Sequence, residues 1–583
     1  MANAPAPGEA PLPAANAAAL LRANAEPGAH ADRTFVRFGD RRWTHAEFLA
    51  ESCRWANLLL ERLPAGRPAH VGVLLDNTPD YLFAFGGAAL VGATVVGLNH
   101  TRQGDHLARD AEHTHVGLLV TEPRHLARVS PVAERLGLAG ERLLVSRRFA
   151  DDGDEGAPDG GHDLADALAR VSAADPGHDP SVDTPWGLIF TSGTTSAPKA
   201  VICSQRRLLV TGTRMSILLG LAPDDVGYVA MPLFHSNALM VGWAPALVTG
   251  ASVGLARRFS ASGWLPDVRR YGATWFNYTG KPLAYLLATP EQPDDADNPL
   301  RVAFGNEGSP EVVSGFARRF GLEVIDSFGA TEGGIAVNRE DGMPPGAMGR
   351  APENVRVVDE DGRDRPLARF DEHGRLVNAD ECVGEIVNVA GVGPFEGYYN
   401  NPEANAATTR NGWYWSGDLG YLDDERFLYF AGRNADWIRV DGENFPAGPV
   451  EAALAGHDAV VEAVAYGVPD ESAGDQVMAA LVLRPGAILD PAAFAAWLDG
   501  LDDLGPKWRP RYLRIAEALP TTGTNKVVKR TLVRQKFRRD RVGADDLWVR
   551  DRGDLAYRPF TAADEAALHE RFVAAGRERF WDL

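Results

Sequence analysis

A loop rich in hydroxyl-bearing and small residues, TSGTTSAPKA at 191–200, is the segment of this sequence best suited to chemistry. It directly follows the short apolar run WGLIF at 186–190, which is typical of a buried strand. Backbone N–H groups and hydroxyls in such a loop can donate hydrogen bonds to phosphate oxygens, and Lys199 adds a compact positive charge. The composition alone fits a solvated Ser/Thr turn equally well. The order of the residues favours a phosphate-binding loop.

Five further segments also carry residues suited to chemistry: PLFHSNAL at 232–239, DSFGATEGG at 326–334, YWSGDLGYLDD at 414–424, AGRNADWIRVDGENFPAGPVE at 431–451 and LPTTGTNKVVKRTL at 519–532. Together with the loop at 191–200, they resemble, in kind and in order, the motifs of the acyl-adenylate-forming enzymes. That superfamily comprises acyl-CoA synthetases, the adenylation domains of peptide synthetases and firefly luciferase. The loop lacks the GxxxxGK[ST] pattern of kinases and GTPases. The resemblance covers the chain from about Thr34 to Gln535.

The resemblance implies a binding site for ATP. The residues that would hold the nucleotide are Thr191, Ser192, Gly193, Thr194, Thr195, Lys199, Asp326, Ser327, Phe328, Gly329, Asp418 and Arg433. An ionised Asp418 would accept hydrogen bonds from both ribose hydroxyls, and Arg433 would lie beside the same ribose. Phe328 would stack on adenine, with ordinary aromatic packing as the alternative. Thr331 would contact the α-phosphate, and Glu332 would coordinate Mg²⁺ that arrives bound to ATP.

A lysine near the end of the resemblance is expected to complete the catalytic group. A carboxylate that attacks the α-phosphate must overcome repulsion between anions, so cations and N–H donors supply the catalysis. By resemblance, Lys526 is the mobile cation that bridges the substrate carboxylate and the α-phosphate. The residues expected to act in catalysis are Lys526, Thr331, Glu332 and His235. Locally, Lys526 belongs to a charge run with Lys529, Arg530 and Arg534 that is usual for a solvated face, so its motif position alone distinguishes it.

Two further groups of residues are assigned by the same resemblance to the acid and to the thiol. The acid pocket would be lined by His235, Asn237, Tyr278, Lys281, Gly305 and Gly329. The thiol donor would approach the turn formed by Gly442, Glu443 and Asn444 when a small domain rotates. This turn fits a plain hairpin equally well, and His235 fits either a gate to the thiol or a core histidine.

Several details resemble one branch of the superfamily, the fatty acid transport proteins and very-long-chain acyl-CoA synthetases. They are FGATEGG, the GEN turn, and TTGTNKVVKRTLV followed by a C-terminal extension that contains YRPF at 557–560. Ser196 and Asn525 stand where the family usually has glycine, in the phosphate loop and before the catalytic lysine. Ala435 at the hinge can absorb a backbone rotation. Lys281 replaces an acid of the long-chain branch and suits a substrate that carries its own anionic group.

Apolar runs that alternate with helical segments must position these motifs. The runs that predict buried strands are HVGVLL at 70–75, ATVVGL at 93–98, VGLLVT at 116–121, ATWFNY at 273–278, RVAFGN at 301–306 and EVIDSFG at 323–329. Active loops of open α/β sheets gather at the carboxyl ends of such strands. Shorter strands and turns between Gly346 and Tyr429 predict a mostly antiparallel subdomain. Beyond Asp436, amphipathic helices mix with strands.

The predicted fold class is α/β, with the architecture of an acyl-adenylate-forming enzyme. A chain of 583 residues is too long for one ordinary core. We expect a large N-terminal AMP-binding domain at 1–432, built from two α/β subdomains and a β-barrel-like subdomain. A small mobile α+β domain at 433–583 would then carry the catalytic-lysine loop and the C-terminal extension. The boundary lies near Arg433.

The composition of the chain limits the classes of molecule that it is expected to bind and the environment in which it is expected to work. A net charge of −20 argues against broad nucleic-acid binding, which needs a surplus of Lys and Arg. Cys53, Cys203 and Cys382 lie far apart and form neither a metal-ligand spacing nor a disulfide pattern. No stretch approaches the roughly 18 apolar residues of a membrane span. The sequence therefore predicts a soluble, cytoplasmic enzyme without an integral membrane segment, and a homodimer is compatible with it.

The predicted reaction is ATP-dependent adenylation of a fatty or aryl acid with release of pyrophosphate, followed by transfer to the thiol of CoA. A carrier-protein thiol is an alternative acceptor that the sequence does not distinguish from CoA. A chemically different alternative is a diazotase that activates nitrite and passes it to an aromatic amine, with Lys281 holding the carboxylate of that amine. A scaffold without catalysis is disfavoured by the intact Lys199, Glu332, Asp418, Arg433 and Lys526.

Overall fold

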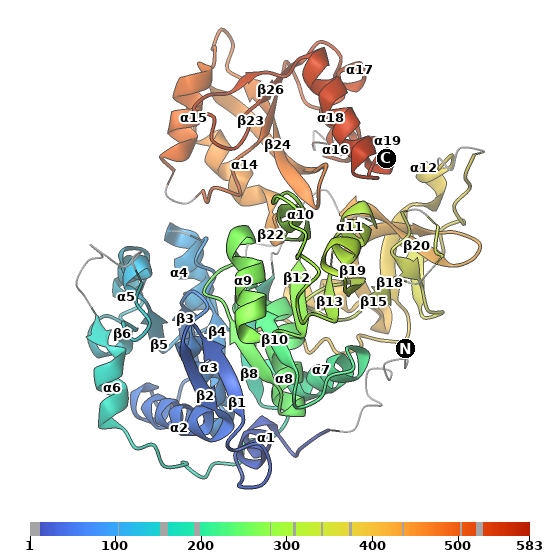
Figure 1. The fold of residues 1–583 in the computed structure, drawn as a ribbon. Helices are drawn as coiled ribbons and strands as arrows, with labels where there is room; N and C mark the ends of the chain where they lie inside the picture. The colour runs from blue at the N-terminus through green and yellow to red at the C-terminus, as the bar shows by residue number, and fades with distance from the viewer. Residues whose placement is uncertain are drawn as a thin grey trace.

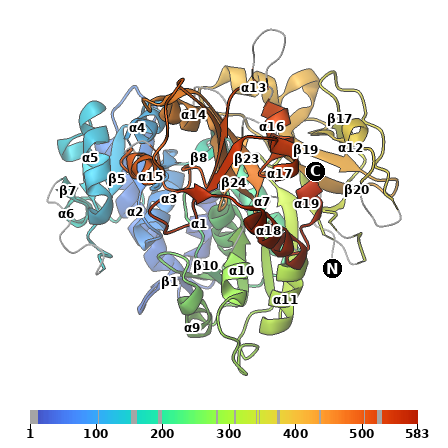
Figure 2. The same cartoon turned by 90° about the horizontal axis from the view of Figure 1, so that it is seen from above.

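The protein is described by a computed structural model in which most of the chain is placed. The described residues are 12–102, 104–151, 161–191, 199–279, 282–306, 310–339, 342–344, 346–371, 376–433, 437–501, 504–520, 527 and 529–582. They form a large N-terminal part and a smaller C-terminal part, which lies above it in Figure 1 and over its middle in Figure 2. No helix in these ranges combines the length and the hydropathy needed to cross a bilayer.

Two largely parallel sheets form the body of the N-terminal part. The strands of the first, in chain order, are β3 (His70–Leu74), β4 (Thr94–Gly97), β5 (Leu118–Thr121), β6 (Leu143–Val145), β7 (His162–Asp163), β8 (Pro185–Thr191) and β9 (Lys199–Ser204). Those of the second are β1 (Thr34–Phe38), β2 (Arg41–Thr44), β10 (Val226–Val229), β11 (Ser252–Leu255), β12 (Trp275–Thr279), β13 (Val302–Asn306), β14 (Glu323–Gly329) and β15 (Ala336–Asn338). Their spatial orders are β7-β6-β5-β3-β4-β8-β9 and β15-β14-β13-β12-β10-β11-β1-β2.

The parallel pairings confirm the buried strands predicted from the apolar runs. β3 pairs in parallel with β4 and β5, and β12, β13 and β14 pair in parallel with one another. Continuous apolar strands of this kind are covered on both faces, here by helices. The covering helices are α1 (Ala17–Asn24), α2 (His45–Arg62), α3 (Pro79–Val91), α4 (Gly104–His113), α5 (Leu126–Arg135), α6 (Leu164–Arg170), α7 (Gln205–Leu218), α8 (Ala244–Thr249), α9 (Ala261–Tyr271), α10 (Pro282–Leu287) and α11 (Pro310–Phe320).

The segment from 346 onward forms the antiparallel subdomain predicted there. Its sheet has the order β16-β20-β19-β18-β17, with every pairing antiparallel. The strands are β16 (Gly349–Arg350), β17 (Val355–Val358), β18 (Gly384–Asn388), β19 (Tyr414–Leu422) and β20 (Phe427–Arg433). Two short helices, α12 (Ala379–Cys382) and α13 (Pro402–Thr408), accompany them.

A new set of pairings begins after β20. Strands β21 (Trp437–Val440) and β22 (Glu443–Pro446) form a separate hairpin. A mixed sheet then follows, in the order β23-β24-β25-β26-β27, with bounds Val460–Pro469, Asp475–Leu483, Tyr512–Ala516, Asp546–Val549 and Arg558–Pro559. Its helices are α14 (Ala447–Ala455), α15 (Pro491–Asp499), α16 (Lys529–Gln535), α17 (Arg539–Val542), α18 (Ala562–Ala574) and α19 (Arg579–Asp582). This part has hydrophobic cores of its own, around residues such as Val450 and Tyr466.

Helix α7 matters most for the functional site, and its position is fixed by a cap at its start and by close packing along its length. The hydroxyl of Ser204 caps its first turn by accepting a hydrogen bond from the backbone N–H of Arg207 at 3.1 Å. Along the helix, Gly212 allows close packing against α8, since a Cβ there would lie 2.7 Å from the carbonyl oxygen of Ala244. Between β10 and α8 the chain forms a π-helix, η4 (Asn237–Trp243), a conformation that is rare and frequent at functional sites.

Candidate active site

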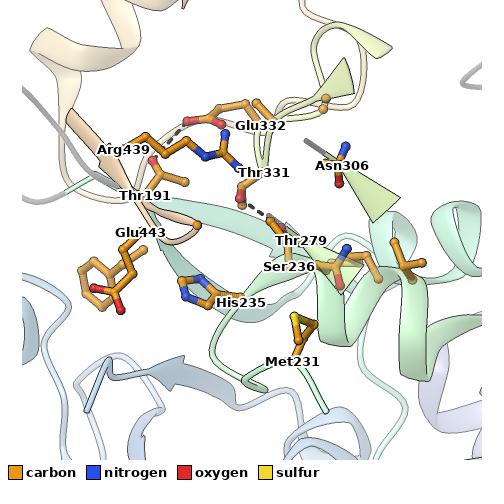
Figure 3. A pocket seen from close by; sticks show the side chains of 18 of the residues that line it. Thr191, Met231, His235, Ser236, Thr279, Asn306, Thr331, Glu332, Arg439 and Glu443 are labelled. Atoms are coloured by element: carbon orange, nitrogen blue, oxygen red, sulfur yellow. Dashed lines mark hydrogen bonds between the residues drawn. The ribbon is translucent and has the colours of Figure 1, made fainter. Parts of the chain in front are cut away.

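A cavity of about 810 Å³ opens where the parallel strands of the second sheet end. Thr279, Asn306 and Gly329, the last residues of β12, β13 and β14, all line it. Lys507 and Trp508 of the C-terminal part line it from the other side. The cavity therefore lies at the carboxyl edge of an open α/β sheet, the place predicted for the active loops, and it is closed by both parts of the chain (Figure 3).

Glu332 anchors the polar end of the cavity. Its side chain is buried, and its Oε1 accepts hydrogen bonds from the Thr191 hydroxyl at 3.1 Å and from the Tyr398 hydroxyl at 2.8 Å. The Lys199 ammonium lies 5.2 Å from the centre of the Tyr398 ring. The predicted residues Thr191, Lys199 and Glu332 thus meet, although they come from three separate segments.

Thr331 lies beside this carboxylate at the junction with the acid pocket. Its hydroxyl is hydrogen-bonded to that of Ser236 at 3.0 Å, which ties it to the segment before η4 (Figure 3). Its backbone carbonyl accepts a hydrogen bond from the guanidinium of Arg207, a buried residue of α7. Sequence reasoning missed Arg207, because the sequence of α7 does not indicate which of its faces lines a cavity.

Asp418 and Phe328 line the same end. Asp418, in β19, is only 3% exposed, although it lines the cavity, and it pairs in register with Arg433 of β20. The Phe328 ring lies 6.1 Å from that of Phe430, and Ser327 also borders the cavity. A carboxylate held at the wall of a cavity beside an aromatic face is a suitable pair for a ribose and a base.

Three predicted residues, Tyr278, Gly305 and Asp326, form a layer behind the cavity and do not line it. The Tyr278 hydroxyl donates to Asp326 Oδ2 at 2.8 Å, and Arg339 Nε donates to Asp326 Oδ1 at 3.0 Å. Gly305 lies so close to Tyr278 that a Cβ there would be 2.4 Å from its carbonyl oxygen. In front of them, Asn237 does line the cavity and donates to the Tyr278 carbonyl oxygen at 3.0 Å.

Several predicted site residues lie outside the described part of the chain. They are Ser192, Gly193, Thr194, Thr195, Lys281 and Lys526, and the side chains of Arg433 and Asn444 also lie outside it. Leu519 and Leu532, on either side of Lys526, are buried in the core of the C-terminal part. The approach of Lys526 to Lys199 and Asp418 therefore stays a prediction.

The turn of the β21–β22 hairpin enters the mouth of the cavity. Asp441 and Gly442 have φ values of +49° and +79°, which suit the two-residue turns of tight hairpins. Glu443 Oε1 accepts from Lys507 Nζ at 2.7 Å, and Oε2 accepts from the Thr101 hydroxyl at 2.8 Å. Burial raises the pKa of Glu443, but the charge and hydrogen bond of Lys507, together with the nearby His235 and Thr101, outweigh it, so the net pKa lies below its usual value. The carboxylate thus links the two parts of the chain.

His235 lies next to Glu443, as Figure 3 shows. Its side chain lines the cavity, and burial lowers its pKa to about 4, with only partial compensation from the Glu443 charge. The imidazole is consequently neutral at neutral pH. Of the two interpretations open from the sequence, this position fits a residue at the mouth of a passage better than one in a closed core.

The opposite end of the cavity is apolar. Its side chains come from α7, η4 and neighbouring segments and include Met215, Leu218, Met231, Met240, Val241, Phe259 and Phe304. On α7 the lining positions are 207, 211, 214, 215 and 218, a spacing that marks one helical face. Sequence reasoning missed this wall, because a helical stripe of this kind is equally typical of ordinary core packing.

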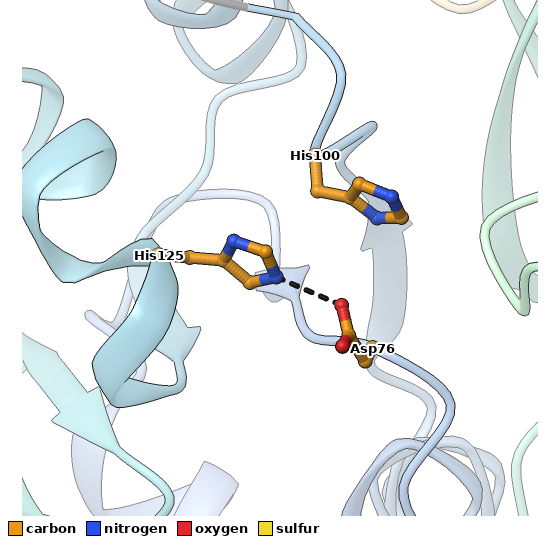
Figure 4. Close-up of side chains that lie close together, drawn as sticks. All are labelled: Asp76, His100 and His125. Carbon is orange, nitrogen blue, oxygen red and sulfur yellow. Dashed lines mark hydrogen bonds and ion pairs between the residues drawn. The ribbon is translucent and has the colours of Figure 1, made fainter. Parts of the chain in front are cut away.

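The side chains of Asp76, His100 and His125 form a cluster (Figure 4). Among the described residues these three have metal-ligand atoms within 4.8 Å of one another. However, Asp76 already accepts from His125 Nε2 at 2.9 Å and from Arg124 at 2.8 Å. Burial raises the pKa of Asp76, but these partners lower it to about 2. Both carboxylate oxygens of Asp76 thus have partners, and the His100 ring lies 5.1 Å from the Phe234 ring, so the cluster packs against the residue before His235.

Known proteins are similar to this chain over most of its length. Residues 23–399 match the family described as AMP-binding enzyme, and residues 449–526 match the AMP-binding enzyme C-terminal domain. The chain is 47% identical to the steroid-22-oyl-CoA synthetase of Rhodococcus jostii, over 94% of this chain and 96% of that protein. It is 45% identical to the medium/long-chain-fatty-acid–CoA ligase FadD17 of Mycobacterium tuberculosis, over 85% and 92% of the two chains.

Solved structures share the fold. The o-succinylbenzoate CoA synthetase of Bacillus subtilis matches with a TM-score of 0.66 at 25% identity, over 89% of this chain and 98% of that one. The amide bond synthetase McbA of Marinactinospora thermotolerans matches with a TM-score of 0.68 at 24% identity, over 89% and 99%.

Proposed function

We propose that this chain, which belongs to the AMP-binding enzyme family and is an ATP-dependent acid–CoA ligase, activates a large and mainly apolar carboxylic acid. The observation that carries the proposal is that one cavity has a polar half and an apolar half, which meet at Thr331. On one side lie the hydrogen-bonded carboxylates and hydroxyls around Glu332, and on the other lies the apolar wall of α7 and η4. The named substrates of the relatives, a steroid acid and medium or long fatty acids, are also large apolar acids.

In the first step, a carboxylate oxygen of the acid forms a bond to the α-phosphorus of ATP while the bond to the β-phosphate oxygen breaks. The products are an acyl adenylate and pyrophosphate. Thr191 and Lys199 would hold the departing phosphates, Thr331 the α-phosphate and Asp418 the ribose. These donors and cations stabilise charge that gathers on phosphate oxygens in the transition state.

Mg²⁺ fits the donor set around Glu332. The ionised carboxylate and nearby hydroxyls are hard oxygen ligands, which Mg²⁺ prefers, and the Glu332 side chain is held in place by two hydroxyl donors. We propose that Glu332 holds the ion that accompanies ATP, whose charge would offset that of the phosphates.

In the second step, the sulfur of CoA attacks the acyl carbon, the bond to the AMP oxygen breaks, and the thiol proton leaves to solvent. We propose that the turn at Gly442, Glu443 and Asn444, together with neutral His235, borders the path of the thiol. The docked hairpin supports this assignment, because its turn already lies at the cavity mouth beside His235.

The first step calls for a different arrangement of the two parts, with Lys526 brought toward Lys199. We propose that residues 433–583 rotate as one unit against residues 1–432. The change of sheet between β20 and β21 supports a hinge there. The hydrogen bond from the Thr101 hydroxyl to Glu443 joins the two parts, and such a rotation can break and remake it.

CoA is favoured over the other acceptors. The named relatives are CoA ligases, which does not favour a nitrite-activating diazotase or a carrier-protein ligase. Arg439, Lys507 and Arg552 also place positive charge at the mouth, which suits the phosphates of CoA. The three cysteines are free and buried, which fits the reducing cytoplasm where we place the enzyme.

The test is pyrophosphate release from ATP over a panel of fatty acids, aryl acids and nitrite, each with and without CoA. We expect release with large apolar acids and formation of the acyl thioester only when CoA is present. Release with nitrite and an arylamine, but with no acid, would overturn the proposal.

A further inference from the structure

Arg214 is a cation in the apolar half of the cavity. It lies on α7 among the lining residues, and on the helix face its neighbours one turn away are Thr211 and Leu218, with Met215 beside it. The facing wall includes Val241 and other apolar side chains. A residue of this charge is unexpected on a surface that would otherwise suit a hydrocarbon chain.

No hydrogen bond or ion pair joins Arg214 to any residue that the structure describes, and its Nε is buried without a partner. The neighbouring arginines of α7, in contrast, have hydrogen-bond or ion-pair partners. Arg206 forms an ion pair with Asp183 at 2.6 Å, and Arg207 donates to the carbonyl oxygens of Ile202 and Thr331. Burial lowers the pKa of Arg214, yet a guanidinium stays charged at neutral pH.

Arg214 is half-buried and its Nε is shielded from water, so the guanidinium loses part of its hydration without gaining a hydrogen bond. Methionine or leucine, as at the nearby positions 215 and 218, would fill the space without that cost. A ligand with an acceptor oxygen would remove the penalty, and the planar guanidinium offers two parallel N–H groups to a carbonyl or carboxylate.

The helix sets where that oxygen would lie. Arg207 contacts the backbone of Thr331, at the point where the acid is activated. Arg214 follows seven residues later on the same face, which corresponds to about 10 Å along the helix axis. A group bound by Arg214 is therefore at the far end of an acid whose carboxylate lies at Thr331.

We infer that Arg214 is a specificity-determining residue that binds a second oxygen acceptor, a ketone or a carboxylate, at the end of the substrate remote from the activated carboxyl group. This inference rests on the proposed ligase function and narrows its substrate class. Plain fatty acids would be accepted, but acids with a distal acceptor would be preferred.

The test compares three acids of equal chain length: decanoic acid, its counterpart with a methyl ketone at the far end, and decanedioic acid. Pyrophosphate release is measured as kcat/KM for the unmodified enzyme, for Arg214→Met and for Arg206→Met, a matched control on the same helix with an exposed, paired arginine. The ketone and dicarboxylate arms distinguish a neutral acceptor from an anionic one.

We expect the unmodified enzyme and Arg206→Met to prefer one of the acceptor-bearing acids by about 10- to 100-fold over decanoic acid. Arg214→Met should lose that preference, so that its kcat/KM values for the three acids become similar. Equal activity of the unmodified enzyme on all three acids would overturn the inference, even if Arg214→Met failed to fold. Absence of release with any acid would instead overturn the proposed function.

Discussion

The side chains of Glu332 and Thr331 at the polar end of the cavity are hydrogen-bonded within the protein, whereas the charged side chain of α7 at the apolar end, Arg214, is not bonded to any residue that the structure describes. At the polar end, Glu332 accepts two hydrogen bonds and Thr331 is bonded to Ser236. At the apolar end, Arg214 has no partner among the described residues. Groups that serve a reaction common to many substrates can be held in place by the protein itself. A group that recognises one class of acid must keep its hydrogen bonds for that acid.

The largest expected effect comes from Lys526, which is proposed to act at the polar end of the cavity. Replacement of Lys526 by alanine should lower the rate of acyl-adenylate formation by about 100- to 1,000-fold, because a cation that neutralises the transition state is lost. The Kd for ATP should change little, since Lys526 is proposed to act on the transferred group. Single-turnover pyrophosphate release and equilibrium ATP binding measure the two quantities.

The matched control for this prediction is Lys529→Ala, which removes a lysine from the same charge run. Lys529 lies 2.8 Å from Glu451, so its role is an ion pair within the C-terminal part. Similar losses in both variants, or an equal loss of ATP binding and adenylation in Lys526→Ala, would contradict the assignment.

The second largest effect is expected at Glu332, the carboxylate that accepts hydrogen bonds from the hydroxyls of Thr191 and Tyr398. Glu332→Gln keeps the shape of the side chain but removes its charge, and should reduce kcat/KM for ATP by about 10- to 100-fold while raising the Mg²⁺ concentration needed for half-maximal rate. Tyr398→Phe removes one hydrogen bond to the same carboxylate and keeps its charge, so a loss of about tenfold or less is expected. Equal Mg²⁺ dependence in the two variants would show that Glu332 serves packing alone.

These two ends also differ in how far the sequence predicted them. The strands and the antiparallel subdomain were predicted from apolar runs and turns. The motifs predicted Thr191, Lys199, Glu332 and Asp418, which line one cavity, because each motif is a short run with its own chemistry. Arg214 was not predicted, since nothing in LLVTGTRMSILLG separates a cavity face from a core face. Which side of α7 faces a cavity depends on packing against η4 and α8, and that packing is set by distant residues.

A smaller effect is expected at the β21–β22 hairpin, where a substitution should slow thioester formation but leave adenylation unchanged. Glu443→Gln weakens the link to Lys507 and should slow thioester formation by about tenfold, with adenylation unchanged. Lys507→Met removes the other partner, and the double variant should be no slower than either single one, because both changes remove the same contact. Acyl-adenylate formation and CoA-dependent turnover are measured separately for each variant. Additive losses in the double variant would show that Glu443 and Lys507 act independently.

The smallest expected effect is on stability and tests whether His235 is held neutral beside this hairpin. Its pKa in the folded protein is about 4, against 6.5 as its ordinary value. Between these values the unfolded chain binds a proton that the folded protein does not, so the contribution of His235 makes stability fall as pH falls, and adds no pH dependence above about pH 7.

His235→Asn removes that one titrating group and leaves the others in place, including His45 and His100 with pKa values of about 4 and Asp110 with a raised pKa of about 6. Because the shared groups cancel in the comparison, the melting temperature of the unmodified protein should fall by about 1–2 °C more than that of the variant between about pH 7 and pH 5. Melting curves at the two pH values measure this difference. An equal fall in both proteins would mean that the imidazole is protonated as readily as in solvent, and would remove the argument that a neutral ring borders the thiol path.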